Sequence, residues 1–244
     1  GNDILFDESQ VEQGRNFCNK IWNAYRLIRG WEVSADIQQS EHSKLAAEWF
    51  DNKLSQTIET IDEHFSKFRL SDALMTLYKF FWDDFCAWYL EVIKPEYGKP
   101  IDKVTYDTTI VFFEKLLRLL HPIMPFITEE LWQNIEERKD GETIMLQPQP
   151  KAAPYSVETI HAFEQGVGAI ASVRNIRQSK GLSPKEALTL QIKGAFPEKI
   201  VSVVKRMANL SEVSLVSEID NSVNGAAFMV DTIEFFVPLT GMVN

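Results

Sequence analysis

The sequence contains little cysteine and no long apolar run. Its 244 residues include two cysteines, Cys18 and Cys86, and neither has a second Cys or a His at metal-ligand spacing. This scarcity argues against a disulfide framework or a zinc site. No stretch of about 18 uncharged apolar residues occurs, and residues 1–6 lack the basic and apolar regions of a signal peptide. We therefore expect a soluble protein of the cytoplasm with no membrane partner.

Positive charge is in the minority. The 25 Lys and Arg residues face 35 Asp and Glu residues, which gives a formal net charge of −10. Nonspecific affinity for nucleic acid comes mainly from phosphate neutralisation, so this balance excludes a protein that coats nucleic acid indiscriminately. Charges act mainly within about 8 to 10 Å, however, so their local placement matters more than their sum. Two stretches without an acid, residues 14–30 and 165–185, therefore predict local basic surfaces.

The periodicity of apolar residues changes along the chain. Hydrophobic residues make up 45% of the sequence, enough for a packed core. Helical spacing dominates the first two-thirds, and short alternating runs dominate the last third. This change predicts two domains, residues 1–150 and 151–244, which are joined by a proline-rich linker at 147–155. The expected fold is mainly α, an antiparallel helical bundle followed by a small α/β domain.

The spacing also predicts the individual elements. Ser71 is the expected N-cap of the third helix, and Gly30 the expected stop of the first. The bundle helices are expected at residues 9–28, 40–65, 71–95, 105–120 and 126–138. In the second domain we expect helices at 157–179 and 197–208, and strands at 187–193, 212–217, 226–230 and 232–238.

The first helix has two different faces. Its apolar face holds Phe17, Ile21, Ala24 and Ile28. The opposite face offers only cations and amides, which donate hydrogen bonds to phosphates and can also read base edges. Two interpretations follow, a surface that contacts RNA and an ordinary solvated face. The residues of this second face are Arg15, Asn19, Asn23 and Arg26, with Lys20 beside them.

Five segments, in order, resemble landmarks of the valyl-tRNA synthetases, a class I aminoacyl-tRNA synthetase family. The first three resemble its anticodon-binding domain, and the last two its C-terminal region. The resemblance covers essentially the whole chain. One departure is Gln149, since a Trp that helps to seat the linker is common between the prolines. The segments are GRNFCNKIWNAYRL (14–27), DDFCAWYLEVIKP (83–95), LLHPIMPFITEELW (119–132), VRNIRQSKGLSP (173–184) and VPLTG (237–241).

The resemblance implies a role in holding tRNA. The expected partner is the anticodon loop and stem of valine tRNA, and binding would support ATP-dependent valylation by the full-length enzyme. The catalytic domain of the same polypeptide is a second expected partner, and we expect a monomer. The residues that the resemblance best implies are Arg15, Asn19, Lys20, Asn23 and Arg26.

Other candidate contacts have competing interpretations. Arg174 and Arg177, one helical turn apart, either grip the tRNA backbone or balance acids on the bundle. The helical spacing of the aromatic residues in 81–89 favours core packing over base stacking. We keep Phe85 and Tyr89 as weaker candidates because they lie towards the end of their helix.

The motifs of class I catalysis are absent from this sequence. In that family an HIGH-type motif and a KMSKS loop stabilise charge on the phosphates of ATP. No histidine here begins an H-x-G-H, and no K-x-S-K-S occurs. We therefore expect an excised, inactive fragment with no catalytic residue, metal or cofactor, while ATP and magnesium are implied for the full-length enzyme. The alternative role is an internal scaffold with little direct RNA contact.

Overall fold

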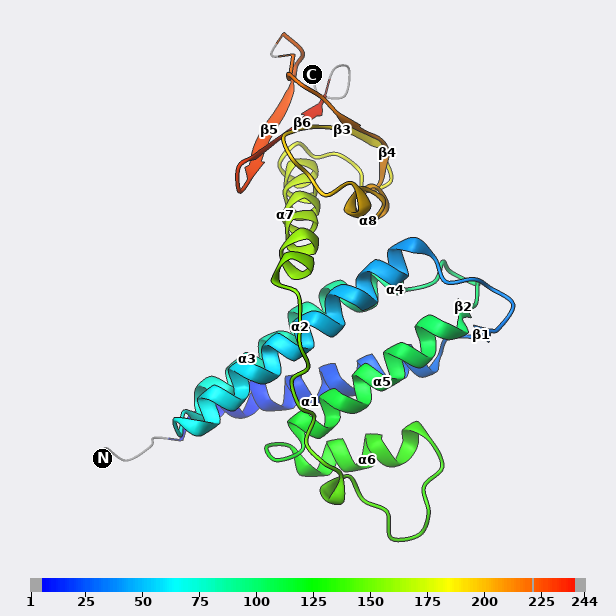
Figure 1. Ribbon diagram of the computed structural model, residues 1–244, viewed down its shortest axis with the longest axis vertical. Helices are drawn as coiled ribbons and strands as arrows, with labels where there is room; N and C mark the ends of the chain where they lie inside the picture. The colour runs from blue at the N-terminus through cyan, green and yellow to red at the C-terminus, as the bar shows by residue number, and fades with distance from the viewer. Residues whose placement is uncertain (1–5, 221, 240–244) are drawn as a thin grey trace. The chain divides into compact units, whose positions relative to one another are not determined.

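The computed structural model describes residues 6–220 and 222–239 of the chain (Figure 1). The described residues are mainly helical and end in a small α/β region, which confirms the predicted fold class. The chain forms two compact units. The first unit holds the chain up to Gln39 and Lys53–Tyr155, and the second holds Ser40–Asn52 and the chain from Ser156. The boundary expected after residue 150 stays a prediction, and the structure adds that residues 40–52 belong with the second unit.

The first unit is built around α1 and the helices that pack with it. Helix α6 packs against α5 and α1, and two very short strands, β1 and β2, pair in parallel. Helix α2 contributes its residues from Lys53 onwards. The elements are α1 (Glu8–Arg29), β1 (Val33–Ser34), α2 (Glu41–Ser66), α3 (Leu70–Lys79), η1 (Phe80–Tyr89), α4 (Leu90–Ile93), β2 (Ile101–Asp102), α5 (Lys103–Leu120), α6 (Pro125–Ile135) and η2 (Ile144–Leu146).

Helix α1 forms as its sequence predicts. The Asp7 carboxylate accepts a hydrogen bond from the backbone N–H of Ser9 and caps the first turn, and Gly30 is the C-cap. The apolar face expected for this helix is buried, with relative exposures of 0 to 5%. Burial of these side chains fixes the rotation of α1, so the opposite face must point to solvent. The buried residues are Phe17, Ile21, Ala24 and Ile28.

The third helix departs from the sequence prediction, a helix at 71–95, both at its start and in its middle. Ser71 is not the N-cap: the helix begins at Leu70, and Arg69 precedes it without a side-chain cap. Phe68, just before this cap, is in the left-handed region (φ 55°), and Ser71 lies in the first turn of the helix. Residues Phe80–Tyr89 then form a π-helix, η1, between α3 and α4. Apolar spacing of three or four residues does not distinguish such a segment from an α-helix.

Other helix ends depend on local side chains. Asp102 caps α5 by accepting from the backbone N–H of Thr105 at 2.8 Å, so this helix begins two residues before the predicted start. Helix α6 begins with Pro125 at its N-terminus and ends at Ile135, three residues before the expected end.

The proline-rich linker lies on the first unit: Arg118 donates to the carbonyl oxygen of Pro148 at 2.9 Å, and the Gln149 amide donates to that of Arg118 at 3.0 Å.

The second unit is a four-stranded sheet packed with helices. The strand order is β4-β3-β6-β5; β3 pairs in parallel with β4 and antiparallel with β6. In the same unit the indole of Trp49 stacks on Phe163, with ring centroids 4.3 Å apart. Helices α7 and α8 contact the sheet at β5 and β4 respectively. The elements are α7 (Val157–Ser179), β3 (Leu188–Lys193), η3 (Glu198–Ile200), α8 (Val201–Met207), β4 (Leu210–Leu215), β5 (Gly225–Val230) and β6 (Ile233–Pro238).

The α/β elements therefore follow the predicted order. Helix α7 has the predicted bounds, because Ser156 caps it through the backbone N–H of Thr159. Each strand begins or ends within three residues of its expected position. The final segment of the family resemblance, at 237–241, lies partly outside the described residues. In the described part of the chain, every helix is too short or too polar to cross a bilayer.

Arg177 is the central polar group of the second unit. Its side chain is 6% exposed, and its guanidinium donates four hydrogen bonds to backbone carbonyl oxygens at 2.6 to 3.1 Å. Burial lowers the pKa of Arg177 from its ordinary value. The group joins the end of α7 to the loop before β3 and to the turn before β4. The four acceptors belong to Ser183, Glu186, Ala208 and Asn209.

We expect Arg177→Met to lower the free energy of unfolding of the second unit by about 2 to 4 kcal/mol, because several buried carbonyl oxygens lose their donor. Hydrogen exchange of the β3 and β4 amides measures this unit alone. Arg174→Met is the matched control, since Arg174 is exposed and donates one of its hydrogen bonds to the carbonyl oxygen of Met207. Similar exchange rates in the two variants would contradict the structural role assigned to Arg177.

Candidate nucleic-acid interface

The face of α1 opposite the core is open to solvent. Four of the five residues predicted for RNA contact on this helix are exposed. Each residue advances about 100° around an α-helix, so positions 15, 19, 23 and 26 share the side that the buried stripe leaves free. No acid occurs between Glu12 and Glu32, so from Arg15 onwards the charged side chains of this face are all cations. The four exposed residues are Arg15, Asn19, Asn23 and Arg26.

Arg15 has one acidic neighbour at the edge of this face. Its guanidinium lies 3.6 Å from the Glu12 carboxylate, one turn earlier on α1. Both side chains are more than 60% exposed. Exposed pairs of this kind contribute roughly 0 to 1 kcal/mol and are screened by salt. The pair therefore leaves Arg15 able to exchange its partner for a phosphate.

Lys20 lies at the flank of the same helix, where η1 passes beside it. Its side chain is half-buried, and its ammonium nitrogen lies 5.0 Å from the ring centroid of Trp82. Trp82 in turn stacks on Tyr78, with centroids 5.5 Å apart. A cation over an aromatic face is stabilised by about 0.5 to 1 kcal/mol at an exposed site. The π-helix thus holds Lys20 in a defined place beside the open face.

The positive charge of Lys20 also acts on the thiol of Cys86. Burial raises the pKa of Cys86 to about 12, and the charge of Lys20 opposes the shift only partly. The thiol is therefore neutral at physiological pH and is not a nucleophile. Cys18 is half-buried. In the described ranges, 6–220 and 222–239, no group of three or more His, Cys, Asp and Glu side chains could hold a metal ion.

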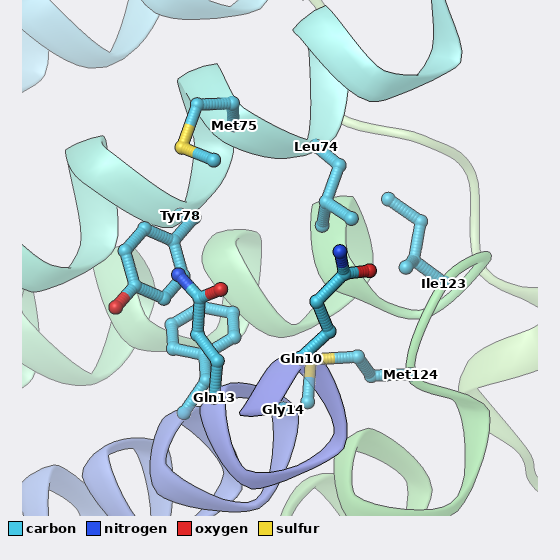
Figure 2. Close-up of a pocket in the computed structure, with 9 residues that line it drawn as sticks. Gln10, Gln13, Gly14, Leu74, Met75, Tyr78, Ile123 and Met124 are labelled. Carbon is cyan, nitrogen blue, oxygen red and sulfur yellow. The ribbon is translucent and has the colours of Figure 1, made fainter. Parts of the chain in front are cut away.

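An open pocket of about 510 Å³ adjoins Tyr78 on the side of the N-terminal turns of α1. Figure 2 shows the Gln10 and Gln13 side chains projecting from α1 into the space below α3. None of the nine lining residues is charged. The sequence pattern does not reveal this pocket, because three separate stretches of the chain line it. The pocket is lined by Gln10, Gln13, Gly14, Phe17, Leu74, Met75, Tyr78, Ile123 and Met124.

Phe85 and Tyr89 do not lie on a surface, so their prediction as base-contacting residues is wrong. Both have 0% exposure. Phe85 stacks with Phe113 of α5, and the Tyr89 hydroxyl forms a 2.9 Å hydrogen bond with Thr109 of the same helix. Burial also raises the pKa of Tyr89. Helix α5 covers the end of η1 that the sequence left open.

The two arginines of the second acid-free stretch, residues 165–185, lie in different environments. The prediction that Arg177 contacts RNA is wrong, because its guanidinium is buried among four backbone carbonyls. Arg174 is exposed and donates to the carbonyl oxygen of Met207 at 3.1 Å, so its contact with RNA stays a prediction. Two arginines one turn apart thus differ because distant backbone segments cover only one of them.

Known proteins have sequences similar to that of this chain. Residues 47–192 match the family described as the anticodon-binding domain of tRNA ligase, a range that includes most of α2 and the elements from α3 to α7. Helix α1 precedes the matched range. The alignments with three relatives, each named valine--tRNA ligase, do include it. They come from Parabacteroides distasonis, Phocaeicola vulgatus and Christiangramia forsetii, and are 50%, 49% and 41% identical to the chain.

The alignment with each of these relatives covers 100% of this chain and 28% of the relative. The chain thus spans little more than a quarter of their length. The family match covers more than half of the chain, and it includes the helices of the first unit from α3 to α6. The chain therefore belongs to the family of anticodon-binding domains of tRNA ligases.

Proposed function

We propose that this chain is the tRNA-binding part of a valine-tRNA ligase, and that the exposed face of α1 receives the anticodon loop of valine tRNA. The observation that carries the proposal is the exposed face of α1 from Arg15 to Arg26, in which no residue is acidic. Four donors, Arg15, Asn19, Asn23 and Arg26, lie in solvent on one side of a helix whose other side is locked into the core.

The chemistry of these side chains suits a single-stranded loop. Unstacked bases expose edges that a duplex hides, and side-chain amides both donate to and accept from such edges. Arginine and lysine bind phosphate, which positions the strand without reading its sequence. We therefore assign base reading to Asn19 and Asn23, and phosphate contacts to Arg15, Lys20 and Arg26. Arg174 is a further phosphate contact on the second unit in this proposal.

The reaction of the whole protein belongs to the same proposal. The chain has neither the H-x-G-H nor the K-x-S-K-S motif, so its residues do not fit an ATP site. We assign ATP, magnesium and the valylation reaction to a catalytic domain elsewhere in the polypeptide, which acts as a cytoplasmic monomer. Binding by α1 would then orient the distant acceptor end of the tRNA for reaction. The internal-scaffold role has no observation in its favour.

The chain is expected to prefer valine tRNA over the same tRNA with a changed anticodon. Each base that is read through a good bidentate contact contributes about 1 to 3 kcal/mol of discrimination. Filter binding or fluorescence titration at moderate salt measures the two affinities, and both tRNAs share every other contact. Equal affinities would contradict specific recognition by this chain.

Charge reversal at Lys20 is expected to weaken tRNA binding and to flatten its salt dependence. Loss of one phosphate contact lowers the slope of log K against log salt by about 1. The matched control is Lys44→Glu, an exposed residue in α2 that changes the net charge by the same amount. Lys44→Glu should leave the slope unchanged. An unaltered binding curve for Lys20→Glu would remove this face of α1 from the tRNA interface.

A further inference from the structure

Asn224 and Gly225 form the one Asn-Gly dipeptide of the sequence, where β5 begins. In such a dipeptide the backbone nitrogen of the glycine can attack the side-chain amide carbon of the asparagine, because glycine has no side chain to hinder the approach. Asn224 is exposed. Among residues 6–220 and 222–239, its side chain has no hydrogen-bond partner that would hold it away from the backbone. The side-chain amide of Asn224 is therefore free to turn towards Gly225.

The register of β5 against β6 leaves the Gly225 amide without a hydrogen bond to the sheet. The backbone N–H of Leu239 donates to the carbonyl oxygen of Asn224 at 2.9 Å, so these two residues form a hydrogen-bonded pair. Opposed residues of an antiparallel ladder alternate between bonded and non-bonded pairs. The next pair, Gly225 with Pro238, is therefore non-bonded, and the Gly225 N–H points away from β6. Because β5 is the edge strand of the sheet (Figure 1), this nitrogen faces no further strand of the described chain.

Packing against β6 requires glycine at position 225. A Cβ there would collide with the Phe236 ring and would lie 2.5 Å from the carbonyl oxygen of Val237. Phe236 and Val237 are both buried, so neither can move aside without disturbing the core of the second unit. The sheet thus holds in place the residue that allows the attack on Asn224. The reactive dipeptide is a by-product of close packing between β5 and β6.

We propose that Asn224 is a site of spontaneous deamidation, in which Gly225 supplies the nucleophile and isoaspartate is the main product. The Gly225 nitrogen loses its proton to hydroxide and forms a bond to Cγ of Asn224. The side-chain nitrogen takes a proton from water and leaves as ammonia, so a five-membered cyclic imide remains. Water then opens the ring: cleavage at Cγ gives aspartate, and cleavage at the more electrophilic main-chain carbonyl carbon gives isoaspartate. The net reaction consumes one water, releases one ammonia and needs no oxidant or cofactor.

Isoaspartate at position 224 changes the backbone where β5 begins. The peptide link then runs through the former side chain, which adds a methylene to the backbone and turns the main-chain carbonyl into a carboxylate branch. The acceptor of the Leu239 N–H therefore leaves its place in the ladder. The Val230–Ile233 pair at the other end of the hairpin keeps its register. The modification thus loosens one end of the β5–β6 hairpin, and this inference is independent of the proposed function.

Peptide mapping of the aged chain tests the site directly. The whole folded chain is incubated at neutral and at mildly alkaline pH, and is then digested at mildly acidic pH. Electron-transfer fragmentation of the peptide that contains Asn224 distinguishes isoaspartate from aspartate, and a change at this residue from one at Asn221. We expect the Asn224 peptide to be converted at a rate proportional to hydroxide concentration. Asn209 is the internal control, because Leu210 follows it and its amide donates to the carbonyl oxygen of Pro184 at 2.9 Å.

The same incubation in denaturant separates the effect of the fold from that of the dipeptide. An amide that is hydrogen-bonded in a stable strand is protected until the strand opens, whereas the Gly225 N–H is free in both states. We therefore expect the rate in the folded chain to lie within about tenfold of the rate in the denatured chain, as for an amide without local protection. An Asn224 that stays intact in the folded chain while the denatured chain is converted would overturn the proposal.

Asn224→Gln is the matched variant, since its longer side chain would have to close a less favourable six-membered ring. Transfer of a labelled methyl group from S-adenosylmethionine by an isoaspartyl methyltransferase measures the isoaspartate in both aged proteins. We expect a signal from the unaltered chain and none from Asn224→Gln; equal signals would overturn the assignment to Asn224. In the modified chain the Leu239 amide should exchange about two- to tenfold faster, as for the loss of one hydrogen bond, while Ile233 is unchanged. Unchanged exchange at Leu239 would overturn the effect inferred for β5.

Discussion

The rotation of α1 about its own axis is the constraint on which the rest of the first unit depends. Phe17 enters an aromatic cluster in which Tyr78 and Phe81 lie 4.7 and 5.7 Å from its ring. Ile21 is fully buried in the next turn. Because these side chains cannot leave the core without losing several kcal/mol of burial free energy, the amides and arginines opposite them are held towards solvent. The exposure of these amides and arginines is thus a product of hydrophobic packing.

The same cluster joins two surfaces that differ in chemistry. Tyr78 contacts both Phe17 and Trp82, so it lies between an uncharged pocket and the ring that carries Lys20. Neither surface requires the α-helix to be distorted, but Trp82 belongs to η1, where the chain is π-helical. The position of Lys20 therefore depends on a segment of unusual backbone geometry. The packing of Phe17, the ring contacts of Tyr78 and Trp82, and the placement of the Lys20 charge are thus linked to one another.

Local sequence signals predict the parts of this structure that local forces determine. The buried stripe of α1 follows from apolar spacing, and the bounds of α7 follow from the Ser156 cap and from Gly181, which has φ of 65° just beyond its end. The exposed residues of α1 are correctly identified for the same reason, since a helix with one buried face has only one face to offer.

Features made by distant segments lie beyond such signals. The pocket combines three stretches of sequence, and the burial of Arg177 depends on the backbone at Ala208 and Asn209. Phe85 and Tyr89 are covered by α5, which the spacing of their own helix does not reveal. The two-residue strands β1 and β2 are too short to produce an alternating pattern. The π-helix has an apolar spacing that resembles an α-helix.

This π-helix has a consequence for how the sequence can vary. In η1 the backbone N–H of Leu90 donates to the carbonyl oxygen of Phe85, five residues earlier, instead of four. The ring contacts within the segment, Phe81 with Phe85 and Phe85 with Tyr89, join side chains four positions apart. Compensating changes among related chains would be spaced by four or five within residues 80–89 and by three or four on either side. A single-residue deletion there would shift every following side chain of the segment around the helix axis.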